Sequence, residues 1–337
     1  MGGSPTEVGQ GHKQVALAVL VLALETATAQ VGAALADEDG TIASSRLARG
    51  RRHVETLHLA VSELCGHAGV SLAELGAVVA DVGPGLFTGL RVGIGAAKAM
   101  AQALEVPVVG VLSLEVLAEA VLSMPVPRCS DPERGTMQAE LDVVAVVDAR
   151  RGEVFAARYR RNLDPACGRS DPASTIDEPG LWKPADLAEE LVRTYEHDRP
   201  SSPGGPYGAV VLIGDGAMRY CETSAQGSVT MVGTSLAGAV LAGRRWSHPS
   251  PSMLAEIGAL RASRGELTPP EELAPVYLRE ADARINWEQR SPAQASDLAG
   301  ASHLKDELAH GHLAHGRDAG GGTGGPLLPG DRTGRLR

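Results

Sequence analysis

The stretch ADVGPGLFTGLRVGIGAAKAMAQAL, from Ala80 to Leu104, begins as an apolar strand and ends as a helix. Its glycines and the nearby Lys98 resemble a phosphate cradle, but neither common nucleotide motif fits. A Walker loop needs a hydroxyl residue after the lysine, where this chain has Ala99. A dinucleotide-binding fingerprint needs a third glycine at the position that Lys98 occupies. The glycines therefore call for a structural explanation.

The same stretch predicts a tight turn followed by a helix with a surface of small residues. The turn consists of Gly83, Pro84 and Gly85, and Thr88 is the expected N-cap. Glycine inside a helix costs about 1 kcal/mol relative to alanine, so we interpret the small residues as room for a closely packed partner. They are Gly89, Gly93, Ala96, Ala97, Ala99 and Ala103.

Strands and helices alternate on both sides of this stretch. An apolar run from Val15 to Leu24 leads into a hairpin with its turn at Asp39-Gly40, and helical spacing follows from His53 to Val70. A second apolar hairpin, Leu141 to Arg161, opens the other half of the chain. This order predicts an α/β architecture of two lobes, each opened by a β-hairpin.

Changes in composition indicate the domain boundaries. Glycine-rich and polar segments occur at both ends, and proline and cysteine gather near the middle. We expect a disordered leader over 1–14, an N-terminal lobe over 15–126, a linker loop over 127–140, a C-terminal lobe over 141–284 and a low-complexity tail over 285–337.

Charge and composition exclude some functions. The net charge is −10 and the pI is about 5.5, so the chain is not expected to bind nucleic acid through its bulk charge. If it serves RNA chemistry, we expect a partner to supply the basic surface. No apolar stretch approaches the roughly 20 residues of a membrane span, so no membrane association is expected.

The cysteines favour a cytoplasmic location. There are four, with no CxxC pair, and their spacing fits neither a zinc site nor a disulfide framework. The apolar run from Val15 followed by ATA also has the pattern of a secretory signal peptide. The residues before the run carry Glu7 as well as Lys13, which favours a buried strand instead.

Five segments of the chain, in this order, resemble the TsaB family, and the match extends from about Val15 to Glu280. They are LALETATAQVGAAL, VGPGLFTGLRVGIGAAKAMA, VPVVGVLSLEVLA, VVDARRGEVFAARY and PVYLRE. The resemblance implies an actin/Hsp70-like (ASKHA) fold of two related lobes. Two departures stand out: Leu86 occupies a position where the family often has serine, and the tail after PVYLRE is unusually long.

The family resemblance also implies a function in tRNA modification. TsaB proteins are inactive paralogues of TsaD, which transfers a threonylcarbamoyl group from its adenylate to the tRNA adenosine next to the anticodon. The resemblance implies a non-catalytic scaffold and activator that pairs with a TsaD-like subunit, with a TsaE-like ATPase docking on the pair. It implies that tRNA meets this chain only through the complex. No cofactor is expected on this chain alone, since ATP and metal belong to the partner subunits. The sequence does not decide between a monomer and a homodimer when TsaD is absent.

The residues agree with an inactive member. TsaD-like enzymes carry metal-binding histidines in an H-x-x-x-H helix, but GVLSLEVLAEA, from Gly110 to Ala120, contains no histidine. His53 and His58 are five apart, which is poor spacing for a shared metal, so we expect no metal site. Three further histidines lie in the tail, in a segment that is not expected to hold a coordination geometry: His310, His312 and His315.

The loop ETAT is a degraded form of the phosphate-binding turn of active ASKHA enzymes. Glu25 stands where those enzymes have aspartate, and Ala27 replaces the glycine of the turn. Thr26 and Thr28 keep hydroxyl groups, so Glu25, Thr26 and Thr28 form a weak candidate nucleotide site. We expect no catalytic residues in this chain.

The resemblance and the small-residue helix together predict the partner interface, with TsaD or in a homodimer. An arginine at Gly93 or Ala97 is then expected to abolish the complex and leave the monomer folded. The expected interface residues are Val54, Leu57, His58, Val61, Gly89, Gly93, Ala96, Ala97 and Met100.

Two enzymatic alternatives remain. One is an ATP-dependent phosphotransferase on the same fold, with Glu25 and Thr28 at the phosphates. The other is a metallopeptidase-like protein, against which the missing H-x-x-x-H argues.

Overall fold

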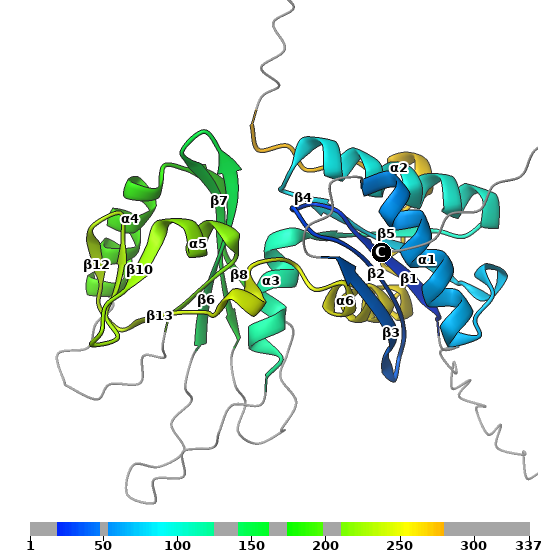
Figure 1. The fold of residues 1–337 in the computed structure, drawn as a ribbon, viewed down its shortest axis with the longest axis horizontal. Helices are drawn as coiled ribbons and strands as arrows, with labels where there is room; N and C mark the ends of the chain where they lie inside the picture. Colours follow the sequence, from blue (N-terminus) through cyan, green and yellow to red (C-terminus); the bar gives the residue numbers. More distant parts are fainter. Residues whose placement is uncertain (1–18, 48–52, 125–140, 162–173, 198–209, 280–337) are drawn as a thin grey trace, which may run out of the picture. The chain divides into compact units, whose positions relative to one another are not determined.

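The computed structural model describes residues 19–47, 53–124, 141–161, 174–197 and 210–279 (Figure 1). All of them belong to Met1–Glu280, one of the two units into which contacts divide the chain, the other being Ala281–Arg337. The leader, the linker loop and the tail predicted from composition lie outside the described residues.

The first lobe is built on a five-stranded mixed sheet with the order β3-β2-β1-β4-β5. Strands β1, β2 and β3 pair antiparallel, β4 pairs with β1 in parallel, and β5 pairs with β4 in parallel. The strands are β1 Val21–Glu25, β2 Val31–Asp37, β3 Gly40–Leu47, β4 Ala77–Gly83 and β5 Val108–Leu112. The pairing of Asp37 with Gly40 confirms the expected hairpin, but its turn is formed by Glu38 and Asp39, one residue earlier than predicted.

The second lobe repeats this plan. Its sheet has the order β13-β9-β6-β7-β8. In both sheets the first three strands of the lobe form an antiparallel meander, a fourth strand pairs with the first in parallel, and a fifth pairs with the fourth in parallel. Its strands are β6 Leu141–Arg150, β7 Glu153–Arg161, β8 Ser174–Trp182, β9 Val210–Ile213 and β13 Ala239–Leu241. The repeated strand order is the actin/Hsp70-like arrangement of two related lobes, each opened by a hairpin.

A small antiparallel sheet and the helices complete the described structure. The small sheet contains β10 Cys221–Thr223, β11 Val229–Met231 and β12 Thr234–Leu236. The α-helices are α1 His53–Ala68, α2 Phe87–Leu104, α3 Ser113–Leu122, α4 Pro184–His197, α5 Asp215–Tyr220 and α6 Pro251–Ser263. Three short 3-10 helices lie at Leu72–Glu74, Arg244–Trp246 and Pro270–Glu272. Within the described ranges there is no helix long and apolar enough to cross a membrane.

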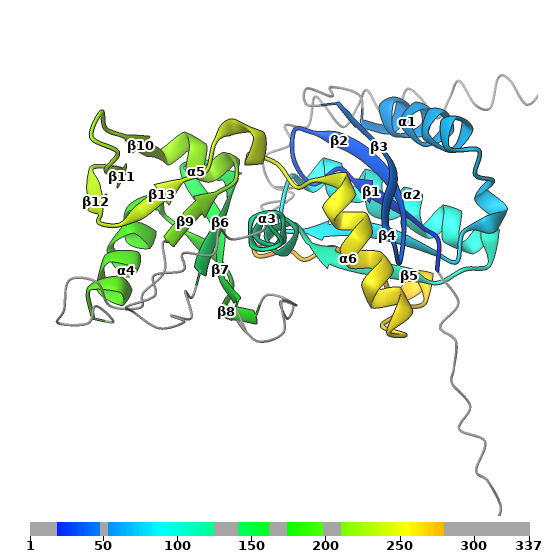
Figure 2. The same ribbon diagram turned by 90° about the horizontal axis from the view of Figure 1, so that it is seen from below.

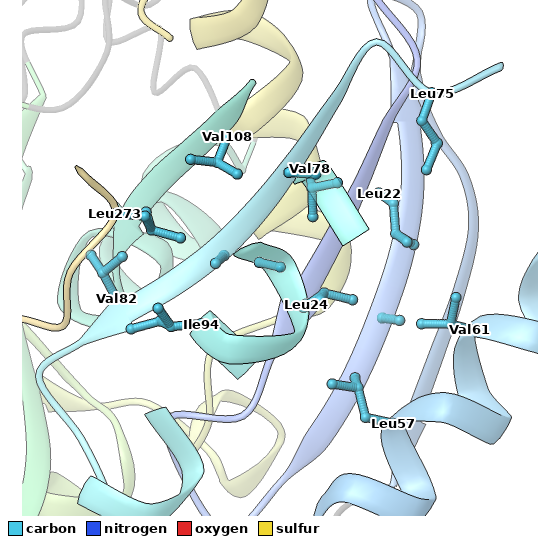
Figure 3. Close-up of a cluster of buried hydrophobic side chains, with 14 of the residues drawn as sticks. Leu22, Leu24, Leu57, Val61, Leu75, Val78, Val82, Ile94, Val108 and Leu273 are labelled. Carbon is cyan, nitrogen blue, oxygen red and sulfur yellow. The ribbon is translucent and has the colours of Figure 1, made fainter. Parts of the chain in front are cut away.

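Helices α1 and α2 cover one face of the first sheet. In Figure 3, Leu22 and Val78 lie on neighbouring strands, with Val61 of α1 and Ile94 of α2 packed near them. Each of these four side chains is at least nine-tenths buried. Aliphatic residues and alanine build this core, as expected for a chain with only 3% aromatic residues.

The last helix of each lobe packs on the sheet of the other lobe. Helix α6, which follows the second lobe in sequence, covers the free face of the first sheet through Leu254 and Ala255 (Figure 2). Helix α3, which follows β5, packs through Leu114 and Leu117 against β6 and β7. The periodicity of a helix indicates that one of its faces is buried, but it does not indicate which sheet covers that face. The sequence therefore could not predict that α3 and α6 each pack on the sheet of the other lobe.

The segment that contains PVYLRE also lies on the first lobe, although sequence order assigns it to the end of the second. The Val276 backbone N–H donates to the carbonyl of Val82 at 2.8 Å, and Thr268 pairs with Val108. The Lys98 ammonium group donates to the carbonyls of Glu271 and Leu273 at 2.9 and 3.0 Å. Lys98 therefore holds this segment against α2 and is not placed to bind phosphate.

The helix cap expected at Thr88 is not formed, and helix α3 likewise begins without a side-chain cap. Helix α2 begins at Phe87 with Leu86 as its N-cap, so Thr88 lies inside the first turn. Helix α3 begins at Ser113, whose hydroxyl group is engaged with another side chain, and Leu112 is the N-cap. In both places the preceding strand is buried, and tertiary packing determines where the helix starts.

Candidate functional site

The carboxyl ends of β1 and β4 place two acidic side chains in the interior of the first lobe. Glu25 and Asp81 are 0% and 1% exposed. The Glu25 carboxylate accepts hydrogen bonds from the Ala27 backbone N–H at 3.0 Å and from Gln30 Nε2 at 2.9 Å. Asp81 Oδ1 accepts from the Ser113 hydroxyl at 2.5 Å and the Gly83 N–H at 2.8 Å. Asp81 Oδ2 is buried without a hydrogen-bond partner.

Burial makes both carboxyl groups hold protons unusually tightly. It raises the pKa of Asp81 from its usual 3.8 to about 7, although the hydrogen bonds from Ser113 and Gly83 act in the opposite direction. Burial, with the nearby Asp81 charge as the second cause, raises the pKa of Glu25 well above its usual value. Two buried carboxyl groups without a cation favour a state that carries fewer than two negative charges.

The loop after β1 uses its polar groups within the fold. The Thr26 hydroxyl donates to the carbonyl of Gly89 at 2.7 Å, and the Thr28 hydroxyl accepts from the Gln30 N–H at 3.3 Å. Together with Glu25, Thr26 and Thr28 are at most 1% exposed. The structure brings these three candidate residues into one loop but leaves their side chains without solvent access for a phosphate.

The turn between β4 and α2 lies directly against this loop. Gly83 has a φ of +95°, which L side chains rarely adopt, and the Gly83–Pro84 peptide bond is cis. The Leu86 N–H donates to the carbonyl of Ala27 at 2.6 Å. A Cβ atom at Gly85 would collide with that same carbonyl oxygen. The glycines of this turn therefore make room for the loop after β1 rather than for a ligand.

Three residues predicted for the partner interface are instead buried inside the lobe. A Cβ atom at Gly93 would collide with Oγ1 of Thr26, and Gly89 accepts the hydrogen bond of that same side chain. Ala97 is fully buried in the core on the α2 side of the sheet. These three residues are small because the chain's own loop and sheet approach the helix, so the expectation that Gly93→Arg and Ala97→Arg leave the monomer folded is wrong.

An apolar groove lies between α1 and α2 on their outer side, with a volume of about 680 Å³. Five predicted interface residues line it: Leu57, His58, Val61, Ala96 and Met100. Its other lining residues are Leu24, Ser62, Cys65, Val70, Leu72, Val92, Gly95 and Ala99. The side chain of Val54 lies outside the described part of the structure.

Two small residues that line the groove, Gly95 and Ala99, were not in the predicted interface. Gly95 and Ala99 are both exposed, and a Cβ atom at Gly95 would meet nothing within 4 Å. Gly93 and Ala97 differ from them by only two positions on the same helix. The sequence does not show which of these small residues face the sheet and which face the groove. Small residues lie on both faces of the helix, so the pattern has little periodicity.

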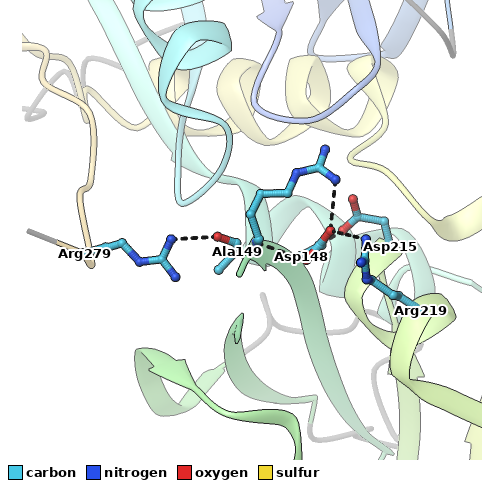
Figure 4. Close-up of polar contacts among 6 residues, drawn as sticks. Asp148, Ala149, Asp215, Arg219 and Arg279 are labelled. Atoms are coloured by element: carbon cyan, nitrogen blue, oxygen red, sulfur yellow. Dashed lines mark hydrogen bonds and ion pairs between the residues drawn. The ribbon is translucent and has the colours of Figure 1, made fainter. Parts of the chain in front are cut away.

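The second lobe has its own polar cluster at the end of β6. The Asp148 carboxylate forms ion pairs with Arg150 at 3.1 Å and Arg219 at 3.2 Å, and Asp215 accepts a hydrogen bond from the Asp148 N–H at 2.9 Å (Figure 4). Burial raises the pKa of Asp215, although the hydrogen bond from Asp148 opposes this shift. Burial lowers the pKa of His248, and the nearby negative charge of Asp215 opposes this shift only in part. The sequence predictions did not include this cluster.

The described residues contain no group of three or more His, Cys, Asp or Glu side chains that could hold a metal ion. His58 is exposed at the groove, and the side chain of His53 is outside the described residues, as are His310, His312 and His315.

Comparison with known proteins shows the family to which the chain is similar. The TsaD family, described as tRNA N6-adenosine threonylcarbamoyltransferase, matches residues 46–287. The chain is 27% identical to the tRNA threonylcarbamoyladenosine biosynthesis protein TsaB of Escherichia coli strain K12, over 77% of this chain and 94% of that one. It is 26% identical to the Bacillus subtilis TsaB protein, over 79% of this chain and 97% of the relative.

A solved structure shows the same fold. It belongs to a Pseudomonas aeruginosa protein described as uncharacterized and similar to the peptidase YeaZ. It aligns with a TM-score of 0.55 at 25% identity, and the match covers 77% of this chain and all of that one.

Proposed function

Because the chain belongs to the TsaB branch of the TsaD family, we propose that it is a non-catalytic subunit of tRNA threonylcarbamoyladenosine synthesis. In this proposal it binds a TsaD-like transferase and activates transfer of the threonylcarbamoyl group to the tRNA adenosine next to the anticodon. The ATP and the metal of the reaction are held by partner subunits, including a TsaE-like ATPase.

The observation that carries this proposal is the apolar groove between α1 and α2. Its walls are mostly apolar, with His58 and Ser62 among the lining residues, and exposed Gly95 and Ala99 allow another helix to approach closely. Burying apolar surface of this kind favours association, because it removes that surface from water. A TsaD-like subunit is the proposed occupant, and a second copy of the chain would occupy the groove in its absence.

The loop after β1 supports a non-catalytic role. Glu25, Thr26 and Thr28 are buried, and their polar atoms are bonded within the fold. Phosphoryl transfer requires groups that can reach a bound nucleotide and its metal ion. The alternative of an ATP-dependent phosphotransferase therefore requires this loop to open.

Reconstitution of tRNA modification tests the proposal. The TsaD-like transferase, the TsaE-like ATPase and the adenylate-forming enzyme are assayed with and without this chain, and modified adenosine is measured by mass spectrometry. We expect product only when the chain is present. Equal product without it would overturn the proposal. Calorimetry of the isolated chain with Mg-ATP tests the phosphotransferase alternative, for which binding and turnover are the required results.

A further inference from the structure

Five cationic side chains gather around the tip of the β6–β7 hairpin, although the whole chain carries a net charge of −10. We call them the hairpin surface: Arg150, Arg151, Lys183, Arg219 and Arg279. They come from the hairpin, the start of α4, helix α5 and the segment that ends the described chain, and neither the groove nor the loop after β1 includes them.

The buried Asp148 carboxylate positions two of these cations. Arg150 and Arg219 both contact its Oδ2 atom, while their side chains stay 53% and 57% exposed. Each contact uses one nitrogen of a guanidinium group that has five N–H donors. The remaining donors are available to a ligand, and the shared carboxylate keeps the two groups close together.

The hairpin surface also includes Arg279 and the two cations that line an open hollow. Arg279 donates to the carbonyl of Ala149 at 2.9 Å (Figure 4). It also pairs with Glu153. Exposed Arg151 and Lys183 line a hollow of about 360 Å³, together with Tyr220.

The hairpin turn directs its arginines outward at a conformational cost. Arg150 and Arg151 have φ values of +64° and +55°, a region that glycine and asparagine usually occupy. Two neighbouring arginines held in this region form a strained turn, of the kind that gathers at binding sites.

We propose that the hairpin surface binds backbone phosphates of the tRNA substrate, an inference that rests on the proposed function. The cations come from several segments around an open hollow, which suits an extended polyanion better than a single enclosed phosphate. The Arg219 guanidinium lies over the ring of Tyr220, 5.6 Å from its centroid, and Tyr220 also lines the hollow, which joins Arg219 to the same surface. The carboxylates that face the cations are Asp148, Asp215 and Glu153, of which Asp148 and Glu153 are already paired.

The test measures tRNA binding to the assembled complex of this chain and its TsaD-like partner. The probe is an unmodified tRNA transcript that carries the target adenosine, and affinity is measured by fluorescence anisotropy between 50 and 200 mM KCl, a range over which phosphate contacts have a large effect. The variant Arg151→Ala/Lys183→Ala removes the two exposed cations that line the hollow. Its slope of log K against log salt should be shallower by about 1.4–1.8, since each phosphate contact contributes about 0.7–0.9.

The control variant Arg193→Ala/Arg264→Ala removes two exposed cations elsewhere and should keep the wild-type slope. An unchanged slope in the Arg151/Lys183 variant, with partner binding intact, would overturn the inference and leave the proposed function standing. Loss of Mg-ATP binding in that variant, without a change in tRNA binding, would assign the surface to nucleotide and also overturn it. If the wild-type chain does not associate with the transferase, both proposals fail.

Discussion

At the scale of single residues, the buried pair Glu25 and Asp81 makes stability depend on pH. Asp81 has a folded-state pKa of about 7 against its usual 3.8, so the folded state holds this proton more tightly than the unfolded state. The stability that comes from this proton is complete below about pH 4 and is lost as pH rises to about 7. Glu25 contributes with the same sign, since its pKa is also raised.

We therefore predict that Asp81→Asn flattens this pH dependence. At pH 8 the variant should have a higher free energy of unfolding than the wild type, by about 1–4 kcal/mol, because no buried charge remains at this position. At pH 4 the two should differ less. Denaturant unfolding at pH 4, 6 and 8 measures the effect, and the exposed Asp39→Asn is the control. A wild-type stability that rises between pH 4 and 7 while that of Asp81→Asn does not would contradict the account.

The second residue-scale prediction concerns the contact between Gly93 and Thr26. Gly93→Ala should lower the free energy of unfolding by about 1–3 kcal/mol, since the added methyl group overlaps Oγ1 of Thr26. Alanine would otherwise stabilise an exposed helix position relative to glycine. In a double-mutant cycle, Thr26→Ala should recover part of the loss, because it removes the colliding atom. Strictly additive effects would show that the two positions are not in contact.

At the scale of elements, helix α2 has two faces composed of the same residue types. Ala97 faces the sheet and is fully buried, whereas Ala99 faces the groove and is exposed. Ala97→Arg should unfold the chain or lower its melting temperature strongly, because it places a charge in a close-packed core. Ala99→Arg should melt within a few degrees of the wild type. Thermal unfolding followed by circular dichroism compares the two, and similar melting temperatures for both would contradict the orientation of α2.

The elements also show which features of the fold and of the groove could be predicted from sequence patterns. Strands with turn residues and strong apolar runs, such as the β2–β3 and β6–β7 hairpins, follow from the sequence because local chemistry determines them. Five of the nine predicted interface residues line the groove. Among them, Leu57 and Val61 on α1, and Ala96 and Met100 on α2, are each four residues apart, which places them on one helix face. The orientation of Gly93 and Gly95 could not be predicted, since it depends on Thr26, some sixty residues earlier in the chain. The hairpin surface was also missed, because its cations are dispersed in the sequence.

At the scale of the whole described molecule, each lobe contributes a helix to the core of the other. Leu117 of α3 is buried against β6 and β7, and Leu254 of α6 is buried against the first sheet. A lobe that unfolds therefore exposes apolar surface of its neighbour, which favours cooperative unfolding.

We predict that Leu117→Ala lowers one common unfolding transition. The cost should be about 2–5 kcal/mol, as for other buried leucines that leave a cavity. Differential scanning calorimetry should show a single peak for the wild type and for the variant, shifted to lower temperature in the variant. Exposed Leu260→Ala on α6 is the control and should shift it little. Two peaks, of which only one responds to Leu117→Ala, would mean that the lobes unfold independently.

The central claim is that the groove between α1 and α2 binds the TsaD-like subunit. Isothermal titration of the transferase with the wild-type chain, Ala99→Arg and Gly243→Arg tests it most directly, because Gly243 is an exposed glycine outside the groove with open space for a side chain. The account predicts saturable binding by the wild type and Gly243→Arg, and no measurable binding by folded Ala99→Arg. Binding of Ala99→Arg with wild-type affinity would contradict it.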